Sequence, residues 1–358
     1  MEVITAAGQW VAFAVLLLSV TGLLRRAVTF VPIPVVKGIQ LGAGLSLILG
    51  AGTSLLQPLH WVEPVLDNRL WAILAFVVLV GTQQMSRFPY ALCFFVLAIA
   101  LGLLDILVRS RHHALPGLHI WRPLFSMPAW IGHKDFPALW MAIGQLPLTV
   151  LNSIIAVSTL ANELLPDVHT PSVTSMGLSV AFMNLTGTWF GAMPVCHGAG
   201  GLAAQYRFGA RSGASVIFLG TVKILLGLLF GNTLLTFLTH YPKSILGIMV
   251  LAAGLELAKV GNSLNNGAPD LWETSAEQDY DGATGGARRQ RDLTDEERQE
   301  RWTVMLMTTA GIMAFRNDAL GFLAGLLCHW SFRVSDCLAK RKAHQRDDFS
   351  TERDPLLR

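Results

Sequence analysis

Apolar residues in this chain occur in long unbroken runs, without a strict alternation of apolar and polar positions. A helix needs about 20 mostly apolar residues to cross the hydrocarbon core of a bilayer. Unbroken runs of that length are typical of such helices and not of half-buried strands. They predict spans at ten places: Trp10–Leu24, Pro34–Leu56, Leu70–Gln83, Tyr90–Val108, Leu139–Ala161, Val173–Ala192, Ala214–Leu238, Ile245–Val260, Trp302–Ala314 and Ala319–Phe332.

Three polar stretches interrupt this pattern. The first, GAMPVCHGAGGLAAQYRFGARSG (Gly191–Gly213), has room only for a half-length helix over residues 198–208. The second, from Gly261 to Arg301, is rich in Gly, Asp, Glu and Arg, so we expect a disordered cytosolic loop over 261–301. The last two spans follow within 302–333, and residues 334–358 are expected to form a cytosolic tail.

The composition agrees with a protein that lies in lipid. The chain is 52% hydrophobic and 14% charged, with a mean hydropathy of +0.48, whereas soluble domains carry roughly 25% charged residues. We therefore expect an all-α polytopic integral membrane protein surrounded by membrane lipid. The net charge of +3 predicts no nucleic-acid partner. The four cysteines lack metal-type or disulfide-type spacing, so no metal site and no cofactor are expected.

Basic residues test which side of the membrane each loop faces. If the half-helix switches sides, most arginines and lysines lie on one face, which the positive-inside rule makes cytosolic. That face includes Arg25, Arg211, Arg291 and Arg341. The loop from Arg109 to Lys134 falls on the other face despite its basic residues.

The polar stretch after Gly191 has the residues of an anion site. Pro194 removes a backbone donor, and the glycines lack a Cβ, so the chain can run extended and then open a helix. A helix that begins inside the bilayer directs unpaired N–H groups and its positive dipole end into a cavity. The predicted substrate-binding residues are Cys196, His197, Gly198, Ala199, Gly200 and Gly201. A packing role for the glycines, as in small-xxx-small contacts, is the alternative.

A second polar group lies in GQLPLTVLNSIIAVS (Gly144–Ser158), in the middle of an apolar span. Polar side chains at that depth are costly unless they face a cavity or another helix. We predict that Gln145, Asn152 and Ser153 line the same cavity as His197 and bind substrate; hydrogen bonding between helices is the alternative. No base with an orienting partner stands beside a nucleophile at a recognisable spacing, so no enzyme is expected.

These two stretches and FVPIPVVKGIQLGAGLS (Phe30–Ser46) resemble the plant and fungal molybdate transporter family, a branch of the sulfate permease superfamily. The resemblance implies two inverted repeats of about seven helices each, arranged as a core and a gate domain of the sulfate permease/uracil permease type. It also implies a secondary active transporter of molybdate that works by alternating access, with a proton coupled through His197. A homodimer is a separate expectation. Family members carry about three further helices before the equivalent of Trp10, so the chain is expected to be N-terminally truncated.

Two alternatives to molybdate transport stay open. Tetrahedral dianions of equal charge cannot be told apart by backbone donors, so a carrier of sulfate or another oxyanion is one. A transport-inactive, truncated or regulatory membrane subunit is the other.

The C-terminal residues TERDPLLR contain a sequence of the acid-x-x-x-Leu-Leu type, formed by Glu352, Leu356 and Leu357. It resembles a sorting motif that adaptor proteins read in cytosolic tails. A sorting adaptor is accordingly an expected partner, and the expected location is a vacuolar or endosomal membrane, with the plasma membrane as the alternative.

Overall fold

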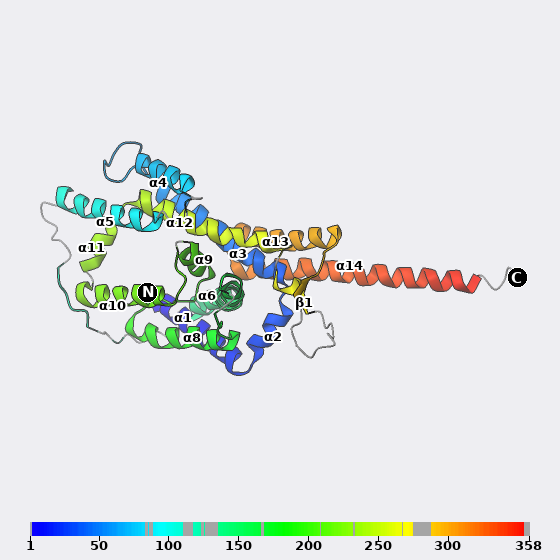
Figure 1. The fold of residues 1–358 in the computed structure, drawn as a ribbon. Coiled ribbons are helices and arrows are strands. Elements are labelled where there is room, and N and C mark those ends of the chain that lie inside the picture. Colours follow the sequence, from blue (N-terminus) through cyan, green and yellow to red (C-terminus); the bar gives the residue numbers. More distant parts are fainter. Residues whose placement is uncertain are drawn as a thin grey trace, which may run out of the picture. The chain divides into compact units, whose positions relative to one another are not determined.

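The computed structural model is nearly all helical (Figure 1). It describes residues 2–82, 85, 89–109, 117–122, 125, 135–165, 168–207, 209–231, 233–266, 268–274 and 288–353. The α-helices are α1 (Glu2–Val20), α2 (Leu23–Phe30), α3 (Ile33–Gly50), α4 (Arg69–Gly81), α5 (Tyr90–Arg109), α6 (Asp135–Val150), α7 (Val157–Leu164), α8 (Val173–Gly187), α9 (Ala199–Arg207), α10 (Ala214–Phe230), α11 (Thr233–Thr239), α12 (Lys243–Ala258), α13 (Asp295–Phe315) and α14 (Asp318–Arg353). The shorter elements are the π-helical η1 (Ala51–Leu56) and η2 (Leu151–Ala156), the 3₁₀-helical η3 (Thr188–Phe190), η4 (Lys259–Ser263) and η5 (Pro269–Leu271), and the strands β1 (Trp272–Thr274) and β2 (Arg288–Gln290).

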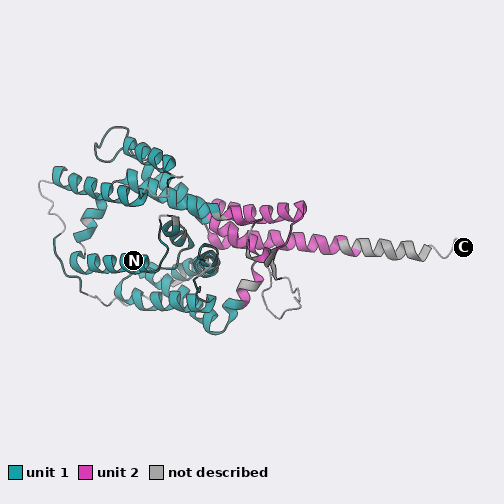
Figure 2. Cartoon of the chain, viewed as in Figure 1, with its two compact units in different colours: residues 1–25, 43–259 teal, residues 26–42, 260–358 magenta. Residues whose placement is uncertain are grey.

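The chain divides into two compact units, coloured in Figure 2. Unit 1 holds residues 1–25 and 43–259, and unit 2 holds residues 26–42 and 260–358.

Several helices have the length and composition of membrane spans. Among the described residues five qualify, and the bent pair of α10 and α11 would make a sixth. The five are Glu2–Val20, Ile33–Leu56, Tyr90–Val108, Pro137–Asn162 and Lys243–Ser263. These apolar helices agree with the expected integral membrane protein.

Close helix crossings in unit 1 depend on glycine. The helix α1 packs against α6 and α8, and α12 packs against α4, η1 and α9. A Cβ added to Gly254 of α12 would lie 2.8 Å from the carbonyl oxygen of Gly44 in α3, and one added to Gly177 would lie 2.2 Å from Ser19 Oγ. Such positions admit no side chain, because interiors are packed at crystal-like density.

Unit 2 is built around the helical hairpin of α13 and α14. A Cβ on Gly311 would lie 2.9 Å from the Cα of Gly321, so the two helices approach through glycine. The connection turns at Arg316, whose φ of 49° is left-handed, and Asn317 Oδ1 accepts the Ala319 N–H at 2.9 Å to begin α14. Unit 2 also buries Lys37 of α3, whose ammonium group donates to Ser263 Oγ at 2.8 Å.

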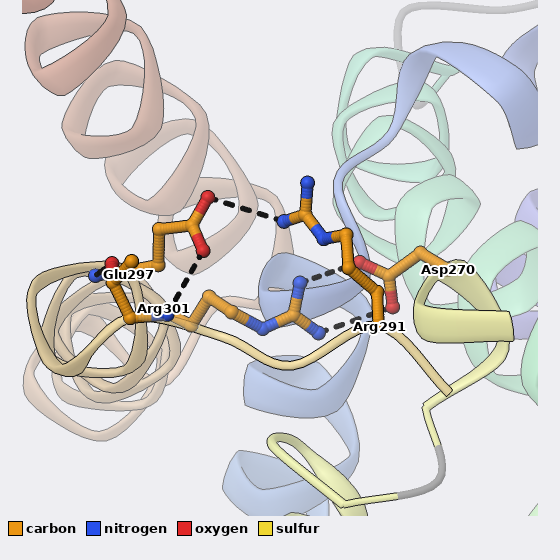
Figure 3. A network of polar contacts seen from close by, with 5 residues as sticks. Asp270, Arg291, Glu297 and Arg301 are labelled. Carbon is orange, nitrogen blue, oxygen red and sulfur yellow. Dashed lines mark hydrogen bonds and ion pairs between the residues drawn. The ribbon is translucent and has the colours of Figure 1, made fainter. Parts of the chain in front are cut away.

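The described ends of the polar insert are ordered, which corrects the expectation of a disordered loop for those residues. The strands β1 and β2 pair antiparallel, and Thr294 and Glu297 form a capping box that begins α13 seven residues before the predicted span. Arg301 forms an ion pair with Asp270 through two contacts, and Arg291 forms one with Glu297 at 3.2 Å (Figure 3). These charges hold the insert to α13, a tertiary contact that composition alone does not reveal.

Two other boundaries differ from the predicted ones. The span expected over Ala214–Leu238 breaks at Gly231, whose φ is 49°, and α10 and α11 are bent by 109°. The expected tail is helical through Arg353, because α14 continues past the predicted end of the last span. Glu352 of the sorting motif therefore lies in α14, and Leu356 and Leu357 lie outside the described residues.

Candidate functional site

The turn before the candidate site begins where α8 and η3 end. Gly191 takes a left-handed φ of 73°, a conformation that glycine adopts without a Cβ penalty. Its N–H donates to the Thr188 carbonyl at 3.2 Å, and the Ala192 N–H donates to the Gly187 carbonyl at 3.2 Å. This arrangement is a Schellman-type helix end. It releases the chain into an extended segment, residues 192–198, which leads to α9.

One buried side chain of α8 fixes this extended segment. Asn184 Oδ1 accepts the Val195 N–H at 2.7 Å, and Asn184 Nδ2 donates to the Val195 carbonyl at 2.7 Å. The same amide also donates to the Val180 carbonyl within its own helix at 3.0 Å. Since both backbone groups of Val195 are paired with one carboxamide, the extended segment is held as a strand would be held by a neighbour.

Helix α1 supports the same segment from another side. Pro194 lies against Gly8, where an added Cβ would come within 2.3 Å of Pro194 Cγ. The adjacent Gln9 is buried and donates through Nε2 to Thr188 Oγ1 at 2.9 Å. The path of the chain into α9 therefore depends on contacts with both α1 and α8.

The short helix expected at residues 198–208 is present as α9 (Ala199–Arg207). Gly198 begins it, since its carbonyl accepts the N–H groups of Gly201 at 3.0 Å and Leu202 at 3.2 Å. The N–H groups of Ala199 and Gly200 pair with no backbone carbonyl among the described residues, as first-turn donors do. These groups and the helix dipole make the start of α9 favourable for an anion.

The three glycines of this motif differ in what surrounds them. A Cβ added to Gly201 would have no heavy atom within 4 Å, and one added to Gly198 would meet only the Gly201 nitrogen at 3.9 Å. One added to Gly200 would touch Leu257 of α12 at 3.4 Å. Gly200 therefore lies at an ordinary contact distance from Leu257, whereas the Cβ positions of Gly198 and Gly201 have open space around them. Ala199 is fully buried.

The imidazole of His197 lies beside a hydroxyl of α8. His197 Nε2 and Ser179 Oγ are 3.1 Å apart, and the contact is partly buried. Cys196 is exposed and has a free thiol. Among the described residues no group of three or more His, Cys, Asp or Glu side chains could hold a metal ion.

The second predicted group lies on the π-helical turn η2, which contacts both α8 and α9. Ser153 is buried, and Asn152 Oδ1 is a buried oxygen that has no hydrogen-bond partner among the described residues. Wide π-turns occur frequently at functional sites. Gln145 lies one helix earlier, in α6, with an exposed side chain. The structure thus brings the turn with Asn152 and Ser153 to α9, and it places Gln145 on a different stretch of the same long span.

Sequence reasoning missed Ser179 and Asn184. Both stand within the apolar helix α8, where a polar side chain is costly unless it has a partner. The argument applied to Gln145, Asn152 and Ser153 would have found them. It could not have said that Asn184 binds backbone and that Ser179 binds an imidazole.

Comparisons with known proteins cover this region. Residues 137–257 match a family described as "Molybdate transporter of MFS superfamily". The chain is similar to Molybdate transporter 2 of Arabidopsis thaliana, with 38% identity over 307 residues, 74% of this chain and 64% of the relative. It is similar to Molybdate transporter 1 of the same plant, with 33% identity over 299 residues, 73% of this chain and 64% of the relative. It is also similar to Molybdate transporter 1 of Chlamydomonas reinhardtii, with 37% identity over 253 residues, 67% of this chain and 40% of the relative.

The matches to the two Arabidopsis proteins span just under two thirds of their lengths. The description of that family names the MFS superfamily, so the expected placement in the sulfate permease superfamily stays a prediction. The family match includes every predicted substrate-binding residue, from Gln145 to Gly201. In the part that holds the candidate site, this chain is therefore similar to proteins named molybdate transporters.

Proposed function

We propose that this protein carries molybdate across a membrane by alternating access, as a secondary active transporter. The observation that carries the proposal is the start of α9, where free backbone N–H groups stand beside two glycines with open space around them. A tetrahedral oxyanion is recognised well by such donors, because its charge is met by dipoles without a fixed cation. The similarity to proteins named molybdate transporters supports molybdate as the oxyanion.

The proposed ligand set has three parts. The N–H groups at the start of α9 bind the oxyanion beside Gly198 and Gly201. His197 adds a donor, and a full positive charge when it is protonated, which would couple a proton to transport. Asn152 and Ser153 on η2, which contacts α9, complete the site, where the Asn152 Nδ2 group and the Ser153 hydroxyl would donate to the oxyanion.

A larger architecture belongs to the same proposal. We place the chain in the inverted-repeat core and gate fold, in which discontinuous helices bind the substrate near the middle of the membrane. The broken entry into α9, with its extended segment anchored by Asn184, supports that placement. The Glu352 motif would direct the carrier to a vacuolar or endosomal membrane.

The test is uptake of radiolabelled molybdate into cells that express the chain and show it in the membrane fraction. Saturable uptake that excess sulfate does not reduce supports a molybdate carrier. Uptake that sulfate abolishes would replace molybdate by sulfate in the proposal. No uptake above the empty-vector control would contradict transport by this chain and favour the regulatory alternative.

A further inference from the structure

Helix α10 buries none of its residues against the described part of the chain. The consecutive residues Ile217, Phe218 and Leu219 are 73%, 68% and 45% exposed. Consecutive helical residues point about 100° apart, so these three face three different sides. A helix at the edge of a bundle covers one side with protein and leaves the other to lipid. Among the described residues no side of α10 is buried in this way, although the Leu228 and Leu229 carbonyls at its end accept N–H groups of Trp121 and His119.

Two glycines of α10 mark the side where a partner would fit. Cβ atoms added to Gly220 and Gly227 would have no heavy atom within 4 Å. Elsewhere in unit 1 a helical glycine pair does have a function, since Gly44 and Gly254 let α3 and α12 approach closely. Small residues in membrane helices serve the same close approach between helices. The surface around Gly220 and Gly227 therefore has the shape of a helix contact without its second helix.

A single charge lies on that side. Lys223 follows Gly220 by three positions and precedes Gly227 by four, a spacing that puts all three residues on one helix face. It is exposed and has no hydrogen bond or ion pair with any described residue. It is about 10–14 Å from both ends of α10 at the rise of a helix. An ammonium group at that depth is costly in lipid and is normally paired with another polar group.

We propose that the α10 face, defined as Gly220, Lys223 and Gly227, docks a membrane-spanning helix that carries one carboxylate at the depth of Lys223. The glycines allow the two helices to approach closely, and the carboxylate supplies the negative charge with which the Lys223 ammonium group pairs. Lipid chains would cover the apolar sides of α10 but would leave the ammonium group unpaired. A second copy of this chain that presents the same face would bring two lysines together, so symmetric pairing through this face is excluded.

The experiment uses the full chain with a C-terminal fluorescent protein, reconstituted in phosphatidylcholine vesicles with labelled peptides. One peptide is a Leu/Ala transmembrane helix with a single central Glu, and its twin has Gln at that place. Energy transfer is measured against peptide density for the wild type, Lys223→Gln and Gly220→Leu. The control variant Leu225→Phe adds bulk on the opposite side of the same helix.

The proposal expects saturable energy transfer with the Glu peptide. It expects association weaker by roughly three- to fifteen-fold for Lys223→Gln, the range found for polar contacts between membrane helices. Gly220→Leu should weaken it and Leu225→Phe should not. A peptide with a central Lys should in turn bind Lys223→Glu. Equal association of the Glu and Gln peptides, or full association of Lys223→Gln, would overturn the proposal, even if molybdate uptake depended on Lys223.

Discussion

Replacing Asn184 by Leu is expected to release the extended segment that leads into α9. The carboxamide makes two 2.7 Å hydrogen bonds with Val195, and a Leu side chain of similar size makes none. Each lost bond leaves one backbone group of Val195 unpaired at about 1–2 kcal/mol, so the two bonds of the anchor are worth about 2–4 kcal/mol in all. That corresponds to a loss of roughly 30- to 1,000-fold in the population that holds the segment in place.

The assay is initial uptake of labelled molybdate by cells with equal amounts of each variant in the membrane. Asn184→Leu should transport at least about tenfold more slowly, because ligand binding depends on the ordered fraction of the site. Asn184→Asp keeps an acceptor for the Val195 N–H and should lie between Asn184→Leu and the wild type. Thr186→Val is the matched control, since among the described residues the Thr186 hydroxyl bonds within its own helix, to the Phe182 carbonyl at 2.7 Å and to the following carbonyl. Uptake by Asn184→Leu equal to that of Thr186→Val would refute this reasoning.

Three further predictions concern the surroundings of the site and the insert. Gly8→Val should lower the thermal stability of the purified protein by about 1–3 kcal/mol, because its side chain would collide with Pro194; an unchanged melting temperature would contradict that contact. Ser179→Ala should shift the pH profile of uptake by removing the partner of His197, whereas a uniform loss at every pH would indicate a structural role only. Burial and nearby carboxylates raise the pKa of Glu300 above its ordinary value. The folded state therefore binds a proton at Glu300 at a higher pH than the unfolded chain does. The free energy of unfolding of the wild type should increase as the pH falls from neutral toward 4.5, the ordinary pKa of Glu. This increase should be smaller in Glu300→Gln, as followed by thermal unfolding.

Some features of the site could be predicted from the sequence, because they depend on local chemistry. The proline and glycines between Gly191 and Gly201 predict a broken chain and a short helix, and α9 is found there. Which glycine faces open space could not be predicted, since Gly200 differs from Gly201 only by the position of Leu257 on a helix more than fifty residues away. The same limit applies to Asn184, whose partner is a backbone group eleven residues later.

The fold shows the same division between local and distant effects. Apolar length predicted the long helices, because burial in lipid depends on composition along one segment. The break at Gly231 and the ordered insert were not predicted. The first requires a left-handed residue inside an otherwise apolar run. The second depends on ion pairs such as Arg301 with Asp270, which are 31 positions apart.

The most direct test of the central claim is binding of molybdate to the purified full-length chain, measured by calorimetry for three proteins. The account predicts that the wild type binds and that Gly201→Leu binds at least roughly tenfold more weakly, because its side chain fills the open space beside the first N–H groups of α9. Gly200→Ala, whose Cβ would make only an ordinary contact with Leu257 at 3.4 Å, should bind like the wild type. Equal binding by Gly201→Leu and the wild type would contradict an oxyanion site at the start of α9.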